Sequence, residues 1–185
     1  MIFRLENISE TDLELVLKWR NTEAIRKCMV NDQIISWEDH CKWFENLCNK
    51  SDREFLIFSI NGEKTGVVSF VDIDLDNKKC HWGFYIGNVK APHGAGSIMA
   101  YHALNYIFGK YGLHNINSEV FQFNKTSLIF HEKLRFKKMG VLEDELLRED
   151  HYQNLVLYSL FRDDWENSRE CIYEKALEKV KLAYE

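Results

Sequence analysis

Two closely spaced glycines, Gly94 and Gly96, stand between an apolar, strand-like run and the first turn of a helix-like segment. Glycine lets the backbone approach a bound group closely, and a helix N-terminus presents free N–H groups and the positive end of its dipole. This arrangement is typical of a phosphate or pyrophosphate site. A tight turn would use the same two glycines, so the loop by itself leaves both interpretations open.

Two common nucleotide-binding motifs do not fit this loop. The dinucleotide fingerprint requires a third glycine where Met99 stands, and it belongs to an all-parallel sheet. Here the preceding segments are separated by hairpin signals such as Asn61-Gly62. The Gly-Lys-Ser/Thr sequence of a P-loop is missing as well.

Metal binding and thiol catalysis are also weakly indicated. The run from Asp72 to Asn77 imitates the start of a calcium loop, but the sixth position is Asn77 and the twelfth is Gly83. A hairpin turn explains it better, and no zinc spacing occurs, so we expect no metal. Cys80 and His81 are adjacent in a predicted strand and therefore point to opposite faces. We expect Cys80 to be a buried structural thiol.

Composition sets the class of protein. The chain has 185 residues, 45% of them hydrophobic and 29% charged, which predicts a folded domain rather than a disordered segment. The formal net charge of −5 disfavours nucleic-acid or membrane partners. No apolar run of about 18 residues and no signal peptide is present. The five cysteines are odd in number and lack a C-x-x-C pair, so we expect buried thiols in a cytoplasmic protein.

Local patterns predict the order α-α-β-β-β-α-β-α-β-β, in an α+β fold with a mixed, mostly antiparallel sheet. Capping patterns at Ser9 and Ser36 open the first two helices. The other expected elements are strands over 55–60, 66–75, 80–86 and 116–121, helices over 97–110 and 125–134, and a strand pair ending with 151–161. Residues 163–185 form an additional helix, whose apolar side comprises Trp165, Ile172, Ala176 and Val180. We expect this apolar side to pack against the protein's own core. A dimer contact is the alternative interpretation.

This order of elements resembles the GNAT family of acetyl-CoA-dependent N-acetyltransferases. The family motif Gln/Arg-x-x-Gly-x-Gly/Ala stands here as residues 91–96, with Ala91 at its first position. Asn-x-x-Ser follows at 124–127, and Tyr-Glu-Lys-x-Gly-Phe appears at 131–136 with His131 and Arg135 as departures. The resemblance implies a GNAT domain over 1–162, central strands that splay apart, acetyl-CoA as cosubstrate, and a helical extension over 163–185.

A closer similarity lies in the N-terminal half. Trp19-Arg20-Asn21, and Glu38-Asp39-His40 with Trp43 and Phe44, resemble the pseudaminic acid biosynthesis N-acetyltransferases. This similarity covers about residues 5–161. It implies that acetyl is transferred to the 4-amine of a UDP-linked 4-amino-4,6-dideoxy-N-acetylaltrosamine by direct attack in a ternary complex. The partner would be this small molecule, and the protein a monomer or homodimer.

The resemblance also implies the residues of the site. Cofactor-binding residues would be Phe84, Tyr85, Ile86, His93, Gly94, Ala95, Gly96, Ser97, Asn124, Ser127 and Phe130. His131 would protonate the departing thiolate, and Ser69 and Glu119 would accept the amine proton through water. Acceptor-binding residues would be Arg20, Met29, His40, Trp43 and His81, with Arg20 paired to the pyrophosphate.

Two other functions remain open. A protein N-terminal acetyltransferase of the ribosomal-protein type shares the opening motif, but its basic peptide acceptor would require an acidic groove. An inactive CoA-binding module would explain the missing tyrosine and the C-terminal helix. At single positions, His131 could instead be a surface residue, Arg20 an exposed arginine, and Met29 and Trp43 members of the core.

Overall fold

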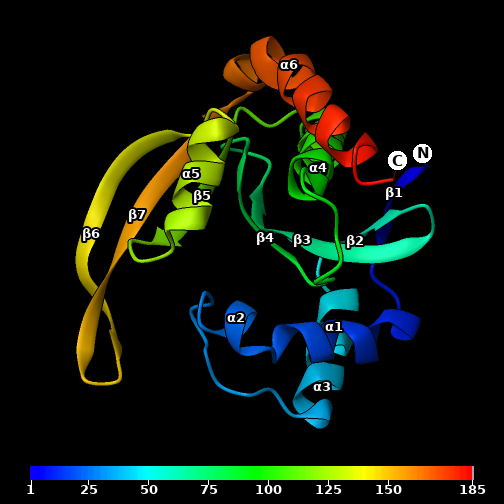
Figure 1. Ribbon diagram of the computed structural model, residues 1–185. Coiled ribbons are helices and arrows are strands. Elements are labelled where there is room, and N and C mark those ends of the chain that lie inside the picture. The colour runs from blue at the N-terminus through cyan, green and yellow to red at the C-terminus, as the bar shows by residue number, and fades with distance from the viewer. Residues whose placement is uncertain (185) are drawn as a thin grey trace.

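A seven-stranded mixed sheet in the order β1-β2-β3-β4-β5-β7-β6 organises the protein, as the computed structural model of residues 1–184 describes it (Figure 1). Only β4 and β5 pair in parallel, which confirms the mostly antiparallel sheet predicted from the sequence. The strands are β1 (Phe3–Asn7), β2 (Glu54–Ile60), β3 (Glu63–Asp74), β4 (Lys79–Ile86), β5 (Asn115–Phe121), β6 (Lys137–Arg148) and β7 (His151–Phe161).

Helices cover both faces of this sheet. One face packs against α1 and α3, and the other packs against α4, α5 and α6 (Figure 1). The helices are η1 (Glu10–Asp12, a 3-10 turn), α1 (Leu13–Arg20), α2 (Glu23–Arg26), α3 (Trp37–Cys48), α4 (Ala95–Tyr111), α5 (Lys125–Lys133) and α6 (Arg162–Lys181). Within residues 1–184, none of these helices is both long and apolar enough to cross a membrane.

The structure confirms the hairpin and the two helix caps predicted from local sequence patterns. Asn61 and Gly62 both have positive φ, 52° and 85°, and they join β2 to β3 as the hairpin pattern predicts. The Ser9 backbone N–H donates to Asp12 Oδ2 (2.8 Å), which closes the predicted capping box. Ser36 Oγ accepts from the backbone N–H of Asp39 (3.1 Å) at the start of α3.

The structure adds two short elements that the sequence pattern did not predict. Strand β1 has five residues, pairs with β2 at the sheet edge and has no strong turn signal beside it. Helix α2 is a four-residue turn without buried residues. The prediction of buried cysteines is wrong for Cys48 and Cys171, which are exposed on the solvent sides of α3 and α6, and holds only in part for Cys28 and Cys41, which are half-buried. Cys80 is buried as predicted, and burial raises the pKa of its thiol to about 12.

Strands β4 and β5 separate soon after they meet. Their parallel register comprises three pairs, from Lys79↔Asn115 to His81↔Asn117. Beyond that point β4 continues to Ile86 and β5 to Phe121 without pairing to each other. The splayed central strands expected from the family resemblance are therefore present, and they leave a gap in the middle of the sheet.

Helix α6 packs on α4 rather than standing apart from the core (Figure 1). Its apolar side is buried as predicted, and the Trp165 Nε1–H donates to Asn105 Oδ1 of α4 (2.9 Å). The helix begins at Arg162 and ends at Lys181. The division of the chain at 162/163 into a domain and an extension stays a prediction, and Glu185, part of that extension, lies outside the described residues.

Gly87, directly after β4, tests how tightly α1 is packed against the sheet. A Cβ at this position would lie 2.0 Å from the indole of Trp19, which is itself buried. Gly87→Ala forces the indole or the backbone to move, so we expect the free energy of unfolding to fall by about 1–3 kcal/mol. Urea denaturation of the ligand-free protein measures this change.

Gly109→Ala in α4 is the matched control. A Cβ there would have no neighbour within 4 Å, so alanine should raise the stability by about 0.5–1 kcal/mol through its helix propensity. Equal stability of Gly87→Ala and the unchanged protein would contradict the packing described for Trp19.

Candidate active site

Two cavities meet at the middle of β4. The first has a volume of about 870 Å³ and lies where β4 and β5 diverge, bounded by α5 and the start of α4. The second, of about 570 Å³, lies between β3, β4, α1 and α3. Met29, Gly83, Phe84 and Tyr85 line both. A group bound in one cavity can therefore reach a group bound in the other at this segment of β4.

The first cavity collects most of the residues predicted to bind the cofactor. Those that line it are Phe84, Tyr85, Ile86, His93, Gly94, Gly96, Ser97, Asn124, Ser127 and Phe130. Ala95 does not line it: its side chain is buried in the core, and its N–H donates to Pro92 O (3.0 Å). Asn124 also has a structural task, because its Oδ1 accepts from the Ser127 N–H (3.1 Å) and caps α5.

The glycine loop presents free donors to the first cavity. Among residues 1–184, the backbone N–H groups of Gly94 and Gly96 have no hydrogen-bond acceptor. Gly94 has a φ of 97°, and a Cβ at Gly96 would lie no closer than 3.6 Å to Phe130. The loop is therefore open toward the cavity at the N-terminus of α4. Such a terminus is suited to a phosphate group.

The free edge of β4 also faces the first cavity. The Gly87 N–H donates to Thr65 O (3.0 Å), and the register between β3 and β4 runs on from there without a shift as far as Val71. Because bonding residues alternate along an antiparallel strand, Tyr85 directs its backbone groups to β3, whereas Phe84 and Ile86 direct theirs to the gap. An extended ligand with amide groups can pair with them as an additional strand would.

His131 is held as a neutral, fully bonded imidazole. It is 1% exposed, and burial lowers its pKa to about 4 although a bond to Ser127 opposes that effect. Nδ1 lies 2.7 Å from Ser127 O and must donate to it, while Nε2 accepts from the Trp82 Nε1–H (3.2 Å). In this neutral form the Nδ1 proton is engaged with Ser127 O, and Nε2 carries no proton. His131 also lines the first cavity, and its role as proton donor to the departing thiolate stays a prediction.

The second cavity contains two buried polar groups without partners. Arg20 on α1 donates from Nη2 to Asn31 O, but its buried Nη1 has no acceptor among residues 1–184. His40 on α3 is 4% exposed and its Nε2 is likewise unpartnered. Buried polar groups are rarely left unpaired in native proteins. These two groups, with Met29 and Trp43 beside them, are suited to a polar ligand in this cavity.

The two residues proposed to accept a proton lie on one face of the sheet but line different cavities. Ser69 lines the second cavity and donates from Oγ to Gly83 O (3.3 Å). The exposed Glu119 lines the first cavity. His81 lines neither, since it precedes the splay and lies 3.7 Å from Asp72 Oδ2 through Nδ1. The structure does not bring His81 to the site, and a water link between Ser69 and Glu119 stays a prediction.

Three charged residues at the site were missed by the sequence analysis. Lys133 and Lys179 line the first cavity, from α5 and α6. Lys133 belongs to the quoted motif at 131–136 and could have been found there. Lys179 and Arg148 carry no local signal, because tertiary packing alone brings them to the site.

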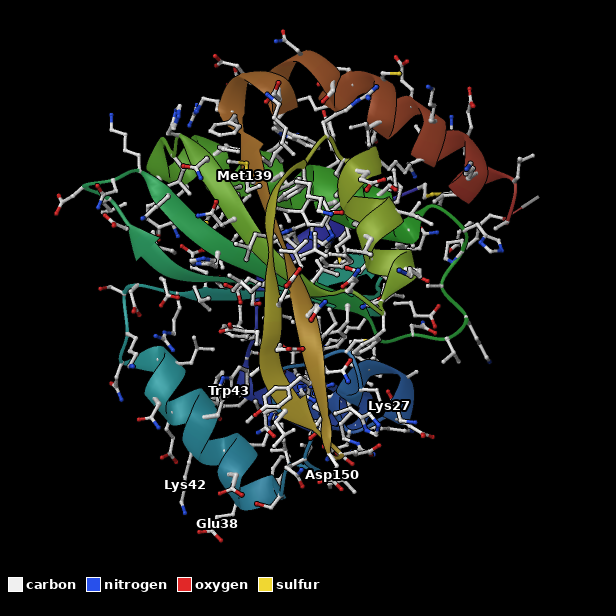
Figure 2. The ribbon with its side chains drawn as sticks, turned by 90° about the vertical axis from the view of Figure 1, so that its left-hand side faces the viewer. Lys27, Glu38, Lys42, Trp43, Met139 and Asp150 are labelled. Atoms are coloured by element: carbon white, nitrogen blue, oxygen red, sulfur yellow. The ribbon has the colours of Figure 1, made fainter. Side chains whose placement is uncertain are left out.

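Arg148 fastens the loop that carries Met29. It lies near the tip of the β6–β7 hairpin, which extends beyond the sheet and reaches the segment around Lys27 (Figures 1 and 2). Its guanidinium donates to the carbonyl oxygens of Lys27 (2.7 Å), Met29 and Val30 (3.1 Å). It also stacks 4.2 Å above the ring of Phe121, which lines the first cavity. One side chain thus connects the walls of both cavities.

Comparison with known proteins agrees with this arrangement. A family model described as the acetyltransferase (GNAT) domain matches residues 3–137. The chain is 27% identical over 139 residues to acetyltransferase PseH of Campylobacter jejuni, covering 73% of this chain and 85% of that protein. It is 20% identical over 163 residues to spermidine N(1)-acetyltransferase of Escherichia coli, covering 88% and 87%.

A solved structure shows the same fold. Spermidine N-acetyltransferase from Vibrio cholerae, crystallised with CoA and spermine, superposes with a TM-score of 0.83 at 17% identity. The superposition covers 89% of this chain and 98% of that chain. The expected fold class is therefore confirmed, including the helices that flank the central strands.

The environment of His131 predicts a specific loss of stability in acid. An unfolded chain binds a proton at this histidine near pH 6.5, whereas the folded chain binds it only near pH 4. The free energy of unfolding should therefore fall as the pH drops from 6.5 to 4, by on the order of 3 kcal/mol from this residue. Urea unfolding across that range, compared with His131→Phe, isolates the contribution. An equal pH slope in the two proteins would refute the buried, neutral state.

Arg148→Ala tests the fastening of the Met29 loop. A hydrogen bond from a charged donor is worth about 1.5–3 kcal/mol, so its loss should speed amide hydrogen exchange in residues 27–33 by about tenfold or more. Mass spectrometry of peptides covering this segment measures the rate. Lys138→Ala, an exposed change on the same strand, should leave the rate unchanged. Unaltered exchange in Arg148→Ala would mean that the loop is held by other contacts.

Proposed function

Because the chain belongs to the GNAT acetyltransferase family, we propose that it acetylates the 4-amine of a UDP-linked 4-amino-4,6-dideoxy-N-acetylaltrosamine with acetyl-CoA. The observation that carries this proposal is the second cavity, whose unpartnered Arg20 nitrogen is buried beside the segment of β4 shared with the cofactor cavity. The resemblance of the N-terminal half to the pseudaminic acid biosynthesis enzymes supports the same acceptor.

The first cavity fits acetyl-CoA in its donor set. The free N–H groups of Gly94 and Gly96 are suited to a diphosphate, and the inward edge of β4 is suited to the amides of pantetheine. When bound, acetyl-CoA supplies a thioester that an uncharged amine attacks directly. A backbone N–H of Phe84 or Ile86 is placed to hold the oxygen of that thioester as negative charge develops on it.

The second cavity favours an anionic acceptor over a polyamine. Arg20 lines it as a cation, and the guanidinium can bind two phosphate oxygens at once. The only carboxylate that lines this cavity in the described chain is Asp39, and it is engaged with the Ser36 hydroxyl at the start of α3 (2.7 Å). A polyamine would require several free carboxylates. The acceptor named in spermidine acetyltransferases is therefore the second candidate, favoured by the 20% sequence identity to one such enzyme and by the fold similarity to another.

Within this proposal Ser69 and Glu119 take the proton of the amine through water. Ser69 pairs with Gly83, and Glu119 lies two residues beyond Asn117, where the β4–β5 pairing ends. An acceptor whose phosphate is bound by Arg20 in the second cavity would direct its amine at the shared segment of β4. The proton then leaves toward solvent along β5, where Glu119 is exposed.

Mass spectrometry of the purified protein with acetyl-CoA and three separate acceptors tests the proposal. We expect one acetyl group on the UDP-4-amino sugar and none on spermidine or on a peptide with a free N-terminus. Acetylation of spermidine or peptide in place of the sugar would overturn the acceptor assignment. Binding of acetyl-CoA without any product would indicate the inactive module.

Arg20→Leu refines the test of the acceptor. Loss of a buried charged contact to phosphate should raise the acceptor KM by about tenfold to a hundredfold. The KM for acetyl-CoA should change little, because Arg20 lines the second cavity only. Lys18→Ala, an exposed change on the same helix, is the control and should leave both values unchanged. An Arg20→Leu enzyme with an unaltered acceptor KM would exclude the proposed phosphate contact.

A further inference from the structure

The last turns of α6 lie directly against the glycine loop. A Cβ on Gly94 would lie 2.7 Å from Ala176 O and 3.3 Å from Lys179 Cβ. Gly94 also has a φ of 97°, a conformation that side chains disfavour. The loop is therefore shaped by the helix above it as well as by the cavity below it. Helix α6 follows residues 3–137, the part of the chain that the family model matches.

Two lysines converge on this end of the first cavity. Lys179 of α6 and Lys133 of α5 both line it, next to Gly94, Gly96 and Ser97. The Lys133 ammonium donates to Ser97 Oγ (2.7 Å), which belongs to the first turn of α4. Within residues 1–184, neither lysine has a carboxylate within 4.0 Å. Among the described residues, both charges therefore lack a protein counterion.

These positive charges lie close enough to affect one another. Burial, and then the charge of Lys179, lower the pKa of Lys133 below its usual range. The free N–H groups of Gly94 and Gly96 add the positive end of the α4 dipole at the same place. Like charges that converge at a point where the described residues place no carboxylate within 4.0 Å are stabilised when an anion binds between them.

We propose that Lys179 and Lys133 bind a phosphate group of CoA, so that the C-terminal helix α6 forms one wall of the cofactor site. This inference rests on the proposed use of acetyl-CoA but not on the identity of the acceptor. The chemistry that both lysines recognise is a phosphate oxygen, either of the diphosphate or of the 3′-phosphate. Ser97 holds the Lys133 ammonium at the helix start, and Lys179 lies directly against Gly94.

Binding of acetyl-CoA to the full-length protein, measured by titration calorimetry without an acceptor, tests this inference. Lys179→Gln should raise the Kd by about three- to tenfold, as expected for one partly exposed charge contact. Lys179→Arg should keep the Kd within about twofold, because it retains the charge. Lys175→Gln is the matched control: it lies one turn earlier on α6, is exposed and does not line the cavity.

Two further ligands identify the phosphate. If Lys179→Gln no longer raises the Kd when the ligand is 3′-dephospho-CoA, the contact is to the 3′-phosphate. If it still raises the Kd of 3′-dephospho-CoA but not that of acetyl-pantetheine, the contact is to the diphosphate. Either pattern supports the inference. An unchanged Kd in Lys179→Gln, or an equal loss with acetyl-pantetheine, overturns it.

The same titrations separate this inference from the proposed function. If Lys179→Gln weakens acetyl-CoA binding but the sugar is not acetylated, the inference about Lys179 is supported and the proposed acceptor is refuted. If the sugar is acetylated but Lys179→Gln leaves the Kd for acetyl-CoA unchanged, the proposed acceptor is supported and the inference about Lys179 is refuted. Absence of any acetyl-CoA binding by the unchanged protein would contradict both.

Discussion

The separation of β4 from β5 is the constraint on which the remaining structure depends. A sheet normally satisfies its backbone groups by pairing, yet here the pairing stops after three residues on each strand and leaves donors and acceptors inside the molecule. Such a gap is tolerated only if its rims are rigid and a ligand can fill it. The antiparallel partners β3 and β7 hold the two rims, and the starts of α4 and α5 close its far end.

Long-range contacts then join the two cavities into one site. The hairpin of β6 and β7 brings Arg148 to carbonyl groups of residues that lie 118 to 121 positions earlier in the chain. The same guanidinium stacks on Phe121 of the gap. Met29 is consequently fixed relative to β5, although α2 itself buries no residue. Packing of Trp82, Phe136 and Tyr158 around His131 supports β4 from the opposite face.

The sequence predicts what depends on neighbours along the chain and misses what depends on distant packing. Helix caps at Ser9 and Ser36, the Asn61-Gly62 hairpin and the glycine loop are local patterns, and the structure reproduces them. Most of the residues predicted to bind the cofactor line one cavity, because they lie in contiguous motifs. The state of His131 depends on Trp82, 49 residues earlier, and no spacing rule reveals such a bond. Lys179 and Arg148 reach the site only through the positions of α6 and the β6–β7 hairpin. His81 was misplaced because the end of the parallel pairing cannot be read from a strand pattern.

The strand order limits how far the protein can be shortened for expression. The stretch matched by the family ends at Lys137, but the antiparallel partner of β5 is β7, which comes after it. A truncated product ending there would leave both edges of β5 largely bare, one of them along Asn115–Phe121 where β7 normally pairs. Unpaired edges invite strand exchange between molecules. The autonomous folding unit is therefore longer than the stretch that the family model matches, and expression trials should keep the chain through β7.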